Sequence, residues 1–318
     1  MTAAVKEYLG EAWKEFERLF EETLDSRIDI LNKVNRYIVE RSGKQLRPML
    51  CLLAAQLCAG CCTDASVRSA VAAEMIHTAT LMHDDVADKS DTRRGFPTVS
   101  AMLSPRAAVL VGDFWLSRGV GAILGTCDGE IFRNYTLCLG ELAEGEMFQI
   151  EKAAALDTTL EDYIYIISYK TSSLFRAAMK SGACSVGASE EAMKAVNCFA
   201  LHLGHAFQMR DDILDYSPSL DIGKPTGQDI RERKITLPLI GAFENAGPQA
   251  RAEVVADIEA ERYDSVLPFV MEHDGIGYAQ KVLERETALA IASLDAFPDS
   301  DARRILISLA QSLCSRQA

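Results

Sequence analysis

Hydrophobic residues recur every three or four positions along almost the whole chain. One series runs from Leu9 through Trp13 and Phe16 to Phe20, and the next runs over residues 28–38. This spacing places the side chains on one face of a helix. The alternating runs that predict strands are scarce. Five longer segments are apolar on more than one side, which is typical of core helices. They are residues 66–90, 105–125, 131–153, 160–184 and 189–216.

Gly and Pro residues mark the breaks between the predicted helices. These breaks fall at residues 42–48, 95–97, 104–105, 217–218, 223–227, 247–248 and 275–277. None of them opens a long polar linker, and the chain has no repeat with a period of about 20 to 50 residues. The pattern therefore predicts an all-α fold, a single large helical bundle that spans residues 1–318.

The composition excludes several classes of protein. With 318 residues, 48% of them hydrophobic, the chain is too apolar for a disordered protein. It has 46 acidic and 33 basic residues, and its net charge of -13 repels phosphate backbones, so we expect no nucleic-acid partner. The longest uninterrupted apolar run, Met49–Ala55, has seven residues, whereas a membrane-spanning helix needs roughly 20. We therefore expect no transmembrane segment.

The first residues and the cysteines indicate the cell compartment. The chain begins with an amphipathic stretch that contains acidic residues, unlike a signal or transit peptide, so we expect a cytoplasmic protein. Its nine cysteines are scattered and are expected to be reduced thiols. Cys58, Cys61 and Cys62 contain a C-x-x-C, but no second pair completes a zinc site, which favours a structural role.

A short acidic pattern, D-D-x-x-D, occurs twice, each time at the C-terminal end of an apolar helical segment. Two carboxylates about 5 Å apart repel by roughly 3 kcal/mol at an effective dielectric constant near 20, so the clusters require a cation or solvent. Oxygen ligands suit Mg²⁺, which substrate phosphates usually help to coordinate. A solvated helix end is the alternative for either cluster alone, and a calcium loop of the EF-hand type is excluded by its missing Gly and Glu. The acids are Asp84, Asp85, Asp88, Asp211, Asp212 and Asp215.

Basic residues occur in the segments before and after both acidic clusters. Each of them, taken alone, is also compatible with an ordinary surface position. Together, in an acidic protein, they indicate two phosphorylated ligands. They are Lys44 and Arg47 beside a predicted helix start, Arg93 and Arg94 after the first cluster, Lys170 in an apolar helix, and Lys224 and Lys234 after the second cluster.

Taken in order, these motifs resemble the trans-isoprenyl diphosphate synthases, also called polyprenyl synthetases. The resemblance covers residues 28–307, and it depends on the order and spacing of many motifs. They are G-K-x-x-R-P at 43–48, E-x-I-H-T-A-T-L-x-H-D-D-V-x-D at 74–88, R-R-G at 93–95, Gly112-Asp113, Gly145-Glu146 with Gln149, Lys170-Thr171, F-Q-x-x-D-D-I-L-D at 207–215, Gly223-Lys224 and T-L-P at 236–238.

The resemblance implies a fold, a set of ligands and residue roles. The fold would be the helical bundle of the isoprenoid synthases, usually a homodimer, with a central active-site cavity. An allylic diphosphate would bind through three Mg²⁺ ions held by the aspartates, and isopentenyl diphosphate would bind without metal. Asp84, Asp88 and Asp211 would be the direct metal ligands. Arg93, Lys170 and Lys224 would hold the allylic diphosphate, with Lys234 as a further basic residue, while Lys44, Arg47, His77 and Arg94 would hold isopentenyl diphosphate.

The implied reaction is an ionisation followed by a condensation. Pyrophosphate leaves the allylic substrate, and the isopentenyl double bond attacks the carbocation. Thr171 and Gln208 would point oxygen atoms at the developing cation. His83, His202 and His205 have no motif role, and we interpret them as structural.

One position departs from the family pattern, and three other functions stay open. The family commonly has Gly before its last basic residue, where this chain has Arg233, so the loop geometry near Lys234 is in question. A terpene cyclase would not need Lys44, Arg47, His77 and Arg94. A metal-binding subunit without turnover would not need Lys170 and Lys224. A farnesyl or geranylgeranyl diphosphate synthase would differ only in its shorter product.

Small side chains below the first acidic cluster predict a long product. Thr80 and Ala79 precede Asp84 by four and five residues, roughly 6 and 7.5 Å along the helix. In the family, short-product enzymes commonly have an aromatic ring at one of these positions. Met75 and Ile76 lie a further turn below. We therefore expect a polyprenyl diphosphate longer than twenty carbons.

Overall fold

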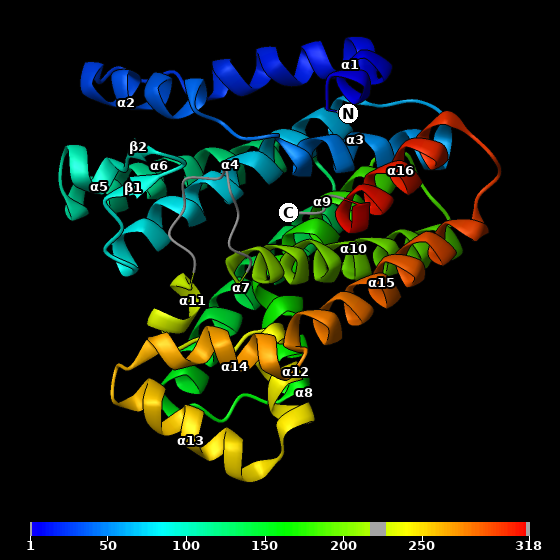
Figure 1. Cartoon of the computed structure of the whole chain (residues 1–318). Helices are drawn as coiled ribbons and strands as arrows, with labels where there is room; N and C mark the ends of the chain where they lie inside the picture. Colours follow the sequence, from blue (N-terminus) through cyan, green and yellow to red (C-terminus); the bar gives the residue numbers. More distant parts are fainter. Residues whose placement is uncertain (1, 217–226, 316–318) are drawn as a thin grey trace. The chain divides into compact units, whose positions relative to one another are not determined.

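The computed structural model describes residues 2–216 and 227–315, and the fold is all-α in these parts (Figure 1). The prediction of the fold class is confirmed, with one small addition. Strands β1 (Thr92–Arg93) and β2 (Phe96–Pro97) pair antiparallel, Thr92 opposite Pro97 and Arg93 opposite Phe96. This hairpin is too short to appear as an alternating pattern in the sequence.

The chain forms two compact units, each made of separated segments. The first unit contains the described parts of residues 1–137, 176–196 and 297–305, and the second contains those of 138–175, 197–296 and 306–318. In the first unit the N-terminal helix meets late residues, since Tyr8 is hydrogen bonded to the backbone of Ala302. The expectation of a single domain stays a prediction.

The first unit is built around two buried helices, the third and fourth of the chain. Its helices are α1 (Thr2–Thr23), α2 (Asp29–Glu40), α3 (Leu46–Ala59), α4 (Asp64–Ala87), α5 (Val99–Met102) and α6 (Pro105–Leu124). Residues 49–55 of α3 have no exposed surface, which explains the longest apolar run in the chain. α4 packs against α3, α6 and α1, and it begins with a capping box between Thr63 and Ser66. α4 therefore holds the first aspartate cluster at the end of a fixed core helix.

Four helices contain residues of both units, and the remaining ones belong to the second. The shared helices are α7 (Gly129–Ala155), α9 (Ser173–Cys184), α10 (Glu190–Tyr216) and α16 (Asp301–Ser315). The second unit adds α8 (Leu160–Ile167), the π-helix η1 (Ser168–Ser172), α11 (Gln228–Arg231), α12 (Leu237–Ala246), α13 (Pro248–Glu259), the 3-10 turn η2 (Tyr263–Ser265), α14 (Val266–Glu272), α15 (Gly275–Ser293) and the 3-10 turn η3 (Leu294–Ala296). α12 lies against α15, α14 and α13.

Among the described residues, α6 is long and apolar enough by length and composition to cross a membrane. A core helix of a soluble protein passes the same test. α6 packs along α4 and buries Trp115, whose indole N–H donates to Asn35 Oδ1 at 2.9 Å. The absence of a transmembrane segment therefore stays a prediction. Counting uninterrupted apolar runs did not detect α6, because glycines and charged residues divide its apolar residues into short runs.

Candidate active site

The first aspartate cluster ends α4 with its three carboxylates in different surroundings. Asp85 is buried and accepts a hydrogen bond from Arg93 Nε at 2.8 Å. Burial raises the pKa of Asp85, although Arg93 opposes the change. Asp84 is half-buried and Asp88 is exposed one turn later, where it caps the helix. The cluster therefore turns one acid inward and leaves the pair at positions i and i+4 nearer to solvent.

The second cluster, at the end of α10, has the same division. Asp211 is exposed, whereas Asp212 is buried and accepts hydrogen bonds from the Tyr163 hydroxyl at 2.7 Å and from Gln208 Nε2 at 2.9 Å. Burial raises the pKa of Asp212 to about 7. Asp215 accepts from the backbone N–H groups of Gln228 and Asp229, at 3.2 and 3.0 Å, and so caps α11.

Both clusters fit a hard cation such as Mg²⁺. Each lies in the last turn of its helix, where the helix dipole is negative and disfavours carboxylates. The donors are all oxygen atoms, which Mg²⁺ prefers. The three predicted direct ligands are not the buried acids of their clusters, since Asp84 is half-buried and Asp88 and Asp211 are exposed.

A small cavity of about 110 Å³ in the second unit is lined by several of the other predicted residues. Its lining includes Lys170, Thr171, Gln208, Asp212, Asp229 and Lys234. Burial raises the pKa of Asp229 to about 8, and Asp212 and Asp215 contribute because they are also acids. Lys224 lies outside the described residues.

Lys170 and Thr171 enter this cavity from the π-helix η1. Lys170 forms an ion pair with Glu146 of α7. One turn of helix separates Glu146 from Gln149, whose Nε2 donates to it at 3.4 Å. A Cβ atom on Gly145 would lie 2.8 Å from Tyr169 Cβ and 2.9 Å from Lys170 N. The Gly145-Glu146 motif therefore lets η1 approach α7 and supplies the partner of its lysine.

A chain of hydrogen bonds joins Thr171 to the second aspartate cluster. The Thr171 hydroxyl donates to Gln208 Oε1 at 2.6 Å, and the Gln208 amide donates in turn to Asp212. Since its only hydroxyl hydrogen is directed at Gln208, Thr171 presents lone pairs elsewhere. Oxygen lone pairs that face a ligand can stabilise a positive charge on it.

The loop before Lys234 adopts the conformation that glycine favours. Arg233 has a φ of 59°, and its backbone N–H donates to Ile230 O at 2.9 Å. The N–H of Lys234 donates to Asp229 O at 2.8 Å, and its ammonium pairs with Glu232. A left-handed non-glycine residue costs roughly 1 to 2 kcal/mol. The question raised by Arg233 is thus answered: the turn forms, under strain.

The predicted isopentenyl diphosphate residues gather in the first unit. Lys44 is exposed and Arg47 is half-buried. Gly43 leaves room for the guanidinium of Arg94, which a Cβ atom would overlap, and Arg94 donates to Arg41 O at 3.3 Å.

The buried Glu74 and the half-buried His77 on α4 lie in the field of these arginines. Burial, together with Arg47, Arg94 and Arg93, holds the pKa of His77 well below its usual range, so this side chain is neutral. Burial raises the pKa of Glu74 to about 7 against the influence of Arg47, Arg94 and Lys6. Its Oε2 atom has no hydrogen-bond partner in the described structure.

The predicted product-length residues line up along α4. Ala79, Met75 and Ile76 are buried, and Thr80 is half-buried with its hydroxyl on His77 O at 2.8 Å. A Cβ on Gly119 of α6 would lie 3.2 Å from Met75 Cβ, so these lower residues pack against α6. Their effect on product length stays a prediction.

The remaining sequence candidates have structural contacts. His83 lies over Gly112 of α6 and contacts Asp113 and Val109 O, both at 3.4 Å. Burial raises the pKa values of Cys58 and Cys62 to about 11, which disfavours thiolate ligands.

Sequence reasoning gave no role to four residues that contact the candidate site. They are Glu74, Glu146, Tyr163 and Asp229. Glu74 and Glu146 lie inside motifs that we identified, so a charged residue in an apolar segment was the available signal. No feature of the sequence pointed to Tyr163 or Asp229.

Comparisons with known proteins identify the family of this chain. The family model described as polyprenyl synthetase matches residues 28–268. The chain is 36% identical over 297 residues to the all-trans-nonaprenyl-diphosphate synthase (geranyl-diphosphate specific) of Rhodobacter capsulatus, covering 92% of this chain and 91% of the relative. This chain therefore belongs to the polyprenyl synthetase family, and the predictions of a prenyltransferase and of a trans-isoprenyl diphosphate synthase are confirmed.

Solved structures give the same fold. A decaprenyl diphosphate synthase from Rhodobacter capsulatus has a TM-score of 0.93 and 34% identity, covering 99% of this chain and 98% of its own. A polyprenyl synthase from Caulobacter crescentus CB15, complexed with calcium and isoprenyl diphosphate, has a TM-score of 0.92 and 31% identity. The match covers 100% of this chain and 98% of that protein's chain. These are the folds of isoprenoid synthases.

Proposed function

We propose that this enzyme condenses isopentenyl diphosphate repeatedly with an allylic diphosphate and releases a polyprenyl diphosphate longer than twenty carbons. The observation that carries the proposal is the pair of aspartate clusters, each with exposed or half-buried acids at a helix end. Mg²⁺ bound there, up to three ions, would neutralise the departing pyrophosphate. The calcium in the related Caulobacter crescentus structure supports a divalent cation.

The allylic substrate would be bound by the residues that line the cavity of the second unit, and Arg93 of the first unit is the further residue predicted to bind its diphosphate. Lys170, Lys224 and Lys234 supply positive charge for its diphosphate. Ionisation breaks the carbon–oxygen bond, and the lone pairs of Thr171 and the carbonyl of Gln208 stabilise the allylic cation. The isopentenyl double bond then attacks that cation, and pyrophosphate takes the proton that is lost.

Isopentenyl diphosphate would be bound by Lys44, Arg47, His77 and Arg94. A neutral His77 donates one ring N–H to the diphosphate while the arginines supply the charge. This second set of phosphate-binding residues disfavours a terpene cyclase. Intact aspartate clusters disfavour a subunit without turnover.

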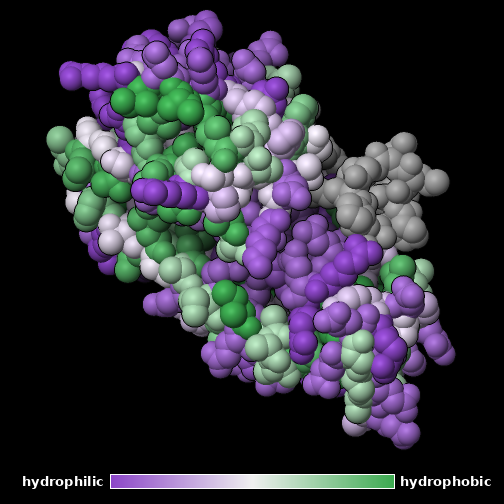
Figure 2. Space-filling view, turned by 90° about the vertical axis from the view of Figure 1, so that its left-hand side faces the viewer, coloured by the Kyte–Doolittle hydropathy of each residue, from purple (hydrophilic) through white to green (hydrophobic). Residues whose placement is uncertain are grey.

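The exposed face of α6 supports a homodimer. Val109, Leu110 and Leu124 are exposed on α6, and Phe132 and Leu137 are exposed on the adjoining part of α7. Exposed Gly121 has open space around its Cα, which permits close approach of a second helix. Figure 2 shows hydrophobic side chains gathered on the face of the molecule toward α5 and α6. We propose that two copies pair through this face, in the cytoplasm.

Pyrophosphate release from isopentenyl diphosphate and geranyl diphosphate tests the function. Activity should require Mg²⁺ and disappear in excess chelator. Asp211→Ala should lower kcat by at least about 10²-fold, the order lost when a preorganised charge stabiliser is removed. Glu253→Ala, an exposed acid on α13, is the matched control and should be unaffected. Full activity of Asp211→Ala, or in chelator, would overturn the metal assignment.

A further inference from the structure

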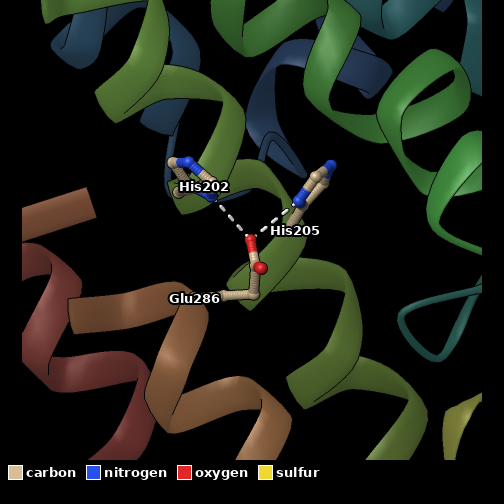
Figure 3. Close-up of side chains that lie close together, drawn as sticks. All are labelled: His202, His205 and Glu286. Carbon is tan, nitrogen blue, oxygen red and sulfur yellow. Dashed lines mark hydrogen bonds and ion pairs between the residues drawn. The ribbon is translucent and has the colours of Figure 1, made fainter. Parts of the chain in front are cut away.

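Two histidines and a glutamate of the second unit meet at one carboxylate oxygen (Figure 3). His202 and His205 of α10 both direct Nδ1 at Glu286 Oε2 of α15, at 2.7 and 2.8 Å. The side chains are 18%, 5% and 12% exposed, respectively. Burial opposes ionisation of Glu286, but the two histidine hydrogen bonds overcome it and lower its pKa to about 2. Glu286 is therefore an ionised carboxylate held inside the protein.

The other nitrogen of His205 reaches the π-helix. His205 Nε2 lies 2.7 Å from the Oγ atom of Ser168, which is the first residue of η1. An ionised carboxylate can only accept hydrogen bonds, so His205 carries a proton on Nδ1 and Nε2 is directed at Ser168. The resulting chain, Glu286 to His205 to Ser168, joins α15 through α10 to η1.

η1 contacts α10 at two further points. The Thr171 hydroxyl binds Gln208, three residues after His205 on α10, and a Cβ on Gly204 would lie 2.7 Å from Ser172 Cα. A π-turn inside a helix is rare and is found frequently at functional sites. Its form therefore depends on the side chains that hold it, and Ser168 is the anchor at its beginning.

We propose that Glu286, His205 and Ser168 are positioning residues that fix the π-turn of η1 and thereby place Lys170 and Thr171 for the allylic substrate. This inference rests on the proposed function, which assigns Lys170 and Thr171 to the allylic substrate. Two other interpretations are less consistent with the geometry. The nitrogen-to-oxygen distances of 2.7 and 2.8 Å are those of hydrogen bonds rather than of ligands spread around a metal ion. A serine nucleophile would need a substrate cavity, and Ser168 does not line the cavity of about 110 Å³ that Lys170 and Thr171 enter.

Steady-state kinetics with both substrates varied tests the proposal. Ser168→Ala and His205→Phe should each lower kcat/KM for the allylic diphosphate about 3- to 10-fold, the effect of losing the hydrogen bond between these two residues, and leave the KM for isopentenyl diphosphate unchanged. Ser168→Ala also loses the bond that the Ser168 hydroxyl donates to Ile164 O at 2.6 Å, so it should be at least as damaging as His205→Phe. The double variant should be no worse than Ser168→Ala alone, because both changes break the same contact between His205 and Ser168. Ser168→Thr keeps the hydroxyl and should restore activity.

His202→Phe is the matched control, since His202 shares Glu286 with His205 but has no hydrogen bond to η1. It should change kcat/KM by less than about twofold. Multiplicative effects in the double variant, equal effects on both substrates, or an equally damaged His202→Phe would overturn the proposal. So would zinc at one ion per chain in the purified protein, lost in His202→Phe. An inactive wild type would instead contradict the proposed function, so the two failures are distinguishable.

Discussion

Three buried carboxyl groups in this chain favour the protonated state. The pKa values of Glu74 and Asp212 rise to about 7, and that of Asp229 rises to about 8, because burial disfavours the charge. A carboxyl group with a higher pKa in the folded than in the unfolded state stabilises the fold while it is protonated. That stabilisation is complete below the ordinary pKa and is lost as pH rises through the folded value.

Glu74 allows a direct measurement because it lies outside both aspartate clusters. Between about pH 4.5 and 7 the wild type should lose up to about 3 kcal/mol from this group, since its pKa rises from 4.5 to about 7. Glu74→Gln cannot ionise and should retain that stability. Urea unfolding of both proteins across this range gives the difference. Identical pH dependence of the two proteins would show that Glu74 is not the group responsible.

The sequence predicted which acids cluster but not which of them turn inward. D-D-x-x-D presents three equivalent candidates, yet Asp85 is buried by Arg93, eight residues away, and Asp212 by Tyr163, 49 residues away in the chain. Such partners depend on tertiary packing. A spacing rule within one helix contains no information about them.

At the scale of the element, Gly145 sets the distance between α7 and η1. Gly145→Ala should push Tyr169 and Lys170 away and lower kcat/KM for the allylic diphosphate at least about tenfold, since small displacements of a binding group reduce catalysis strongly. Gly140, on the same helix, has open space around it. Gly140→Ala should preserve activity and stabilise the fold by about 0.5 to 1 kcal/mol. Thermal unfolding and kinetics of the pair measure both effects, and equal kinetics would contradict the assignment.

Helix positions could be predicted well from the apolar spacing, and their irregularities could not. The expected segment 105–125 matches α6 (Pro105–Leu124), and 131–153 lies within α7 (Gly129–Ala155). The expected segment 160–184 is instead interrupted by the π-turn η1. Its apolar residues keep a helical spacing on both sides, so only docking against α10 reveals the interruption.

At the scale of the whole molecule, the apolar face of α6 should control assembly. Leu110→Glu places a charge on a side chain that is 59% exposed, so it should leave the monomer fold intact and separate the proposed dimer. Leu289→Glu on α15, which is 39% exposed, is the control and should stay dimeric. Sedimentation equilibrium gives the mass of each. A monomeric wild type, or a dimeric Leu110→Glu, would contradict the proposed interface.

Product length is the second property of the whole enzyme that the structure allows us to test. Ala79 is 1% exposed on α4, five residues before Asp84, and the growing chain is expected to pass it. Ala79→Phe should shorten the product while condensation continues, whereas Ala79→Ser should leave it unchanged. Chromatography of dephosphorylated products gives the lengths. A wild-type product of fifteen or twenty carbons with excess isopentenyl diphosphate, or no shortening in Ala79→Phe, would contradict the prediction.

The segmental make-up of the two units has a consequence for how the protein is made. The first unit needs residues 297–305, and Tyr8 near the start of the chain waits for Ala302 to be synthesised. At about 5 to 20 residues per second, a ribosome takes on the order of 10 to 30 s to pass from the first long segment of this unit to its last. During that interval α1 lacks the contact between Tyr8 and Ala302. Completion of the first unit therefore waits for its last segment, and a nascent chain halted before residue 297 is the form that chaperones would meet.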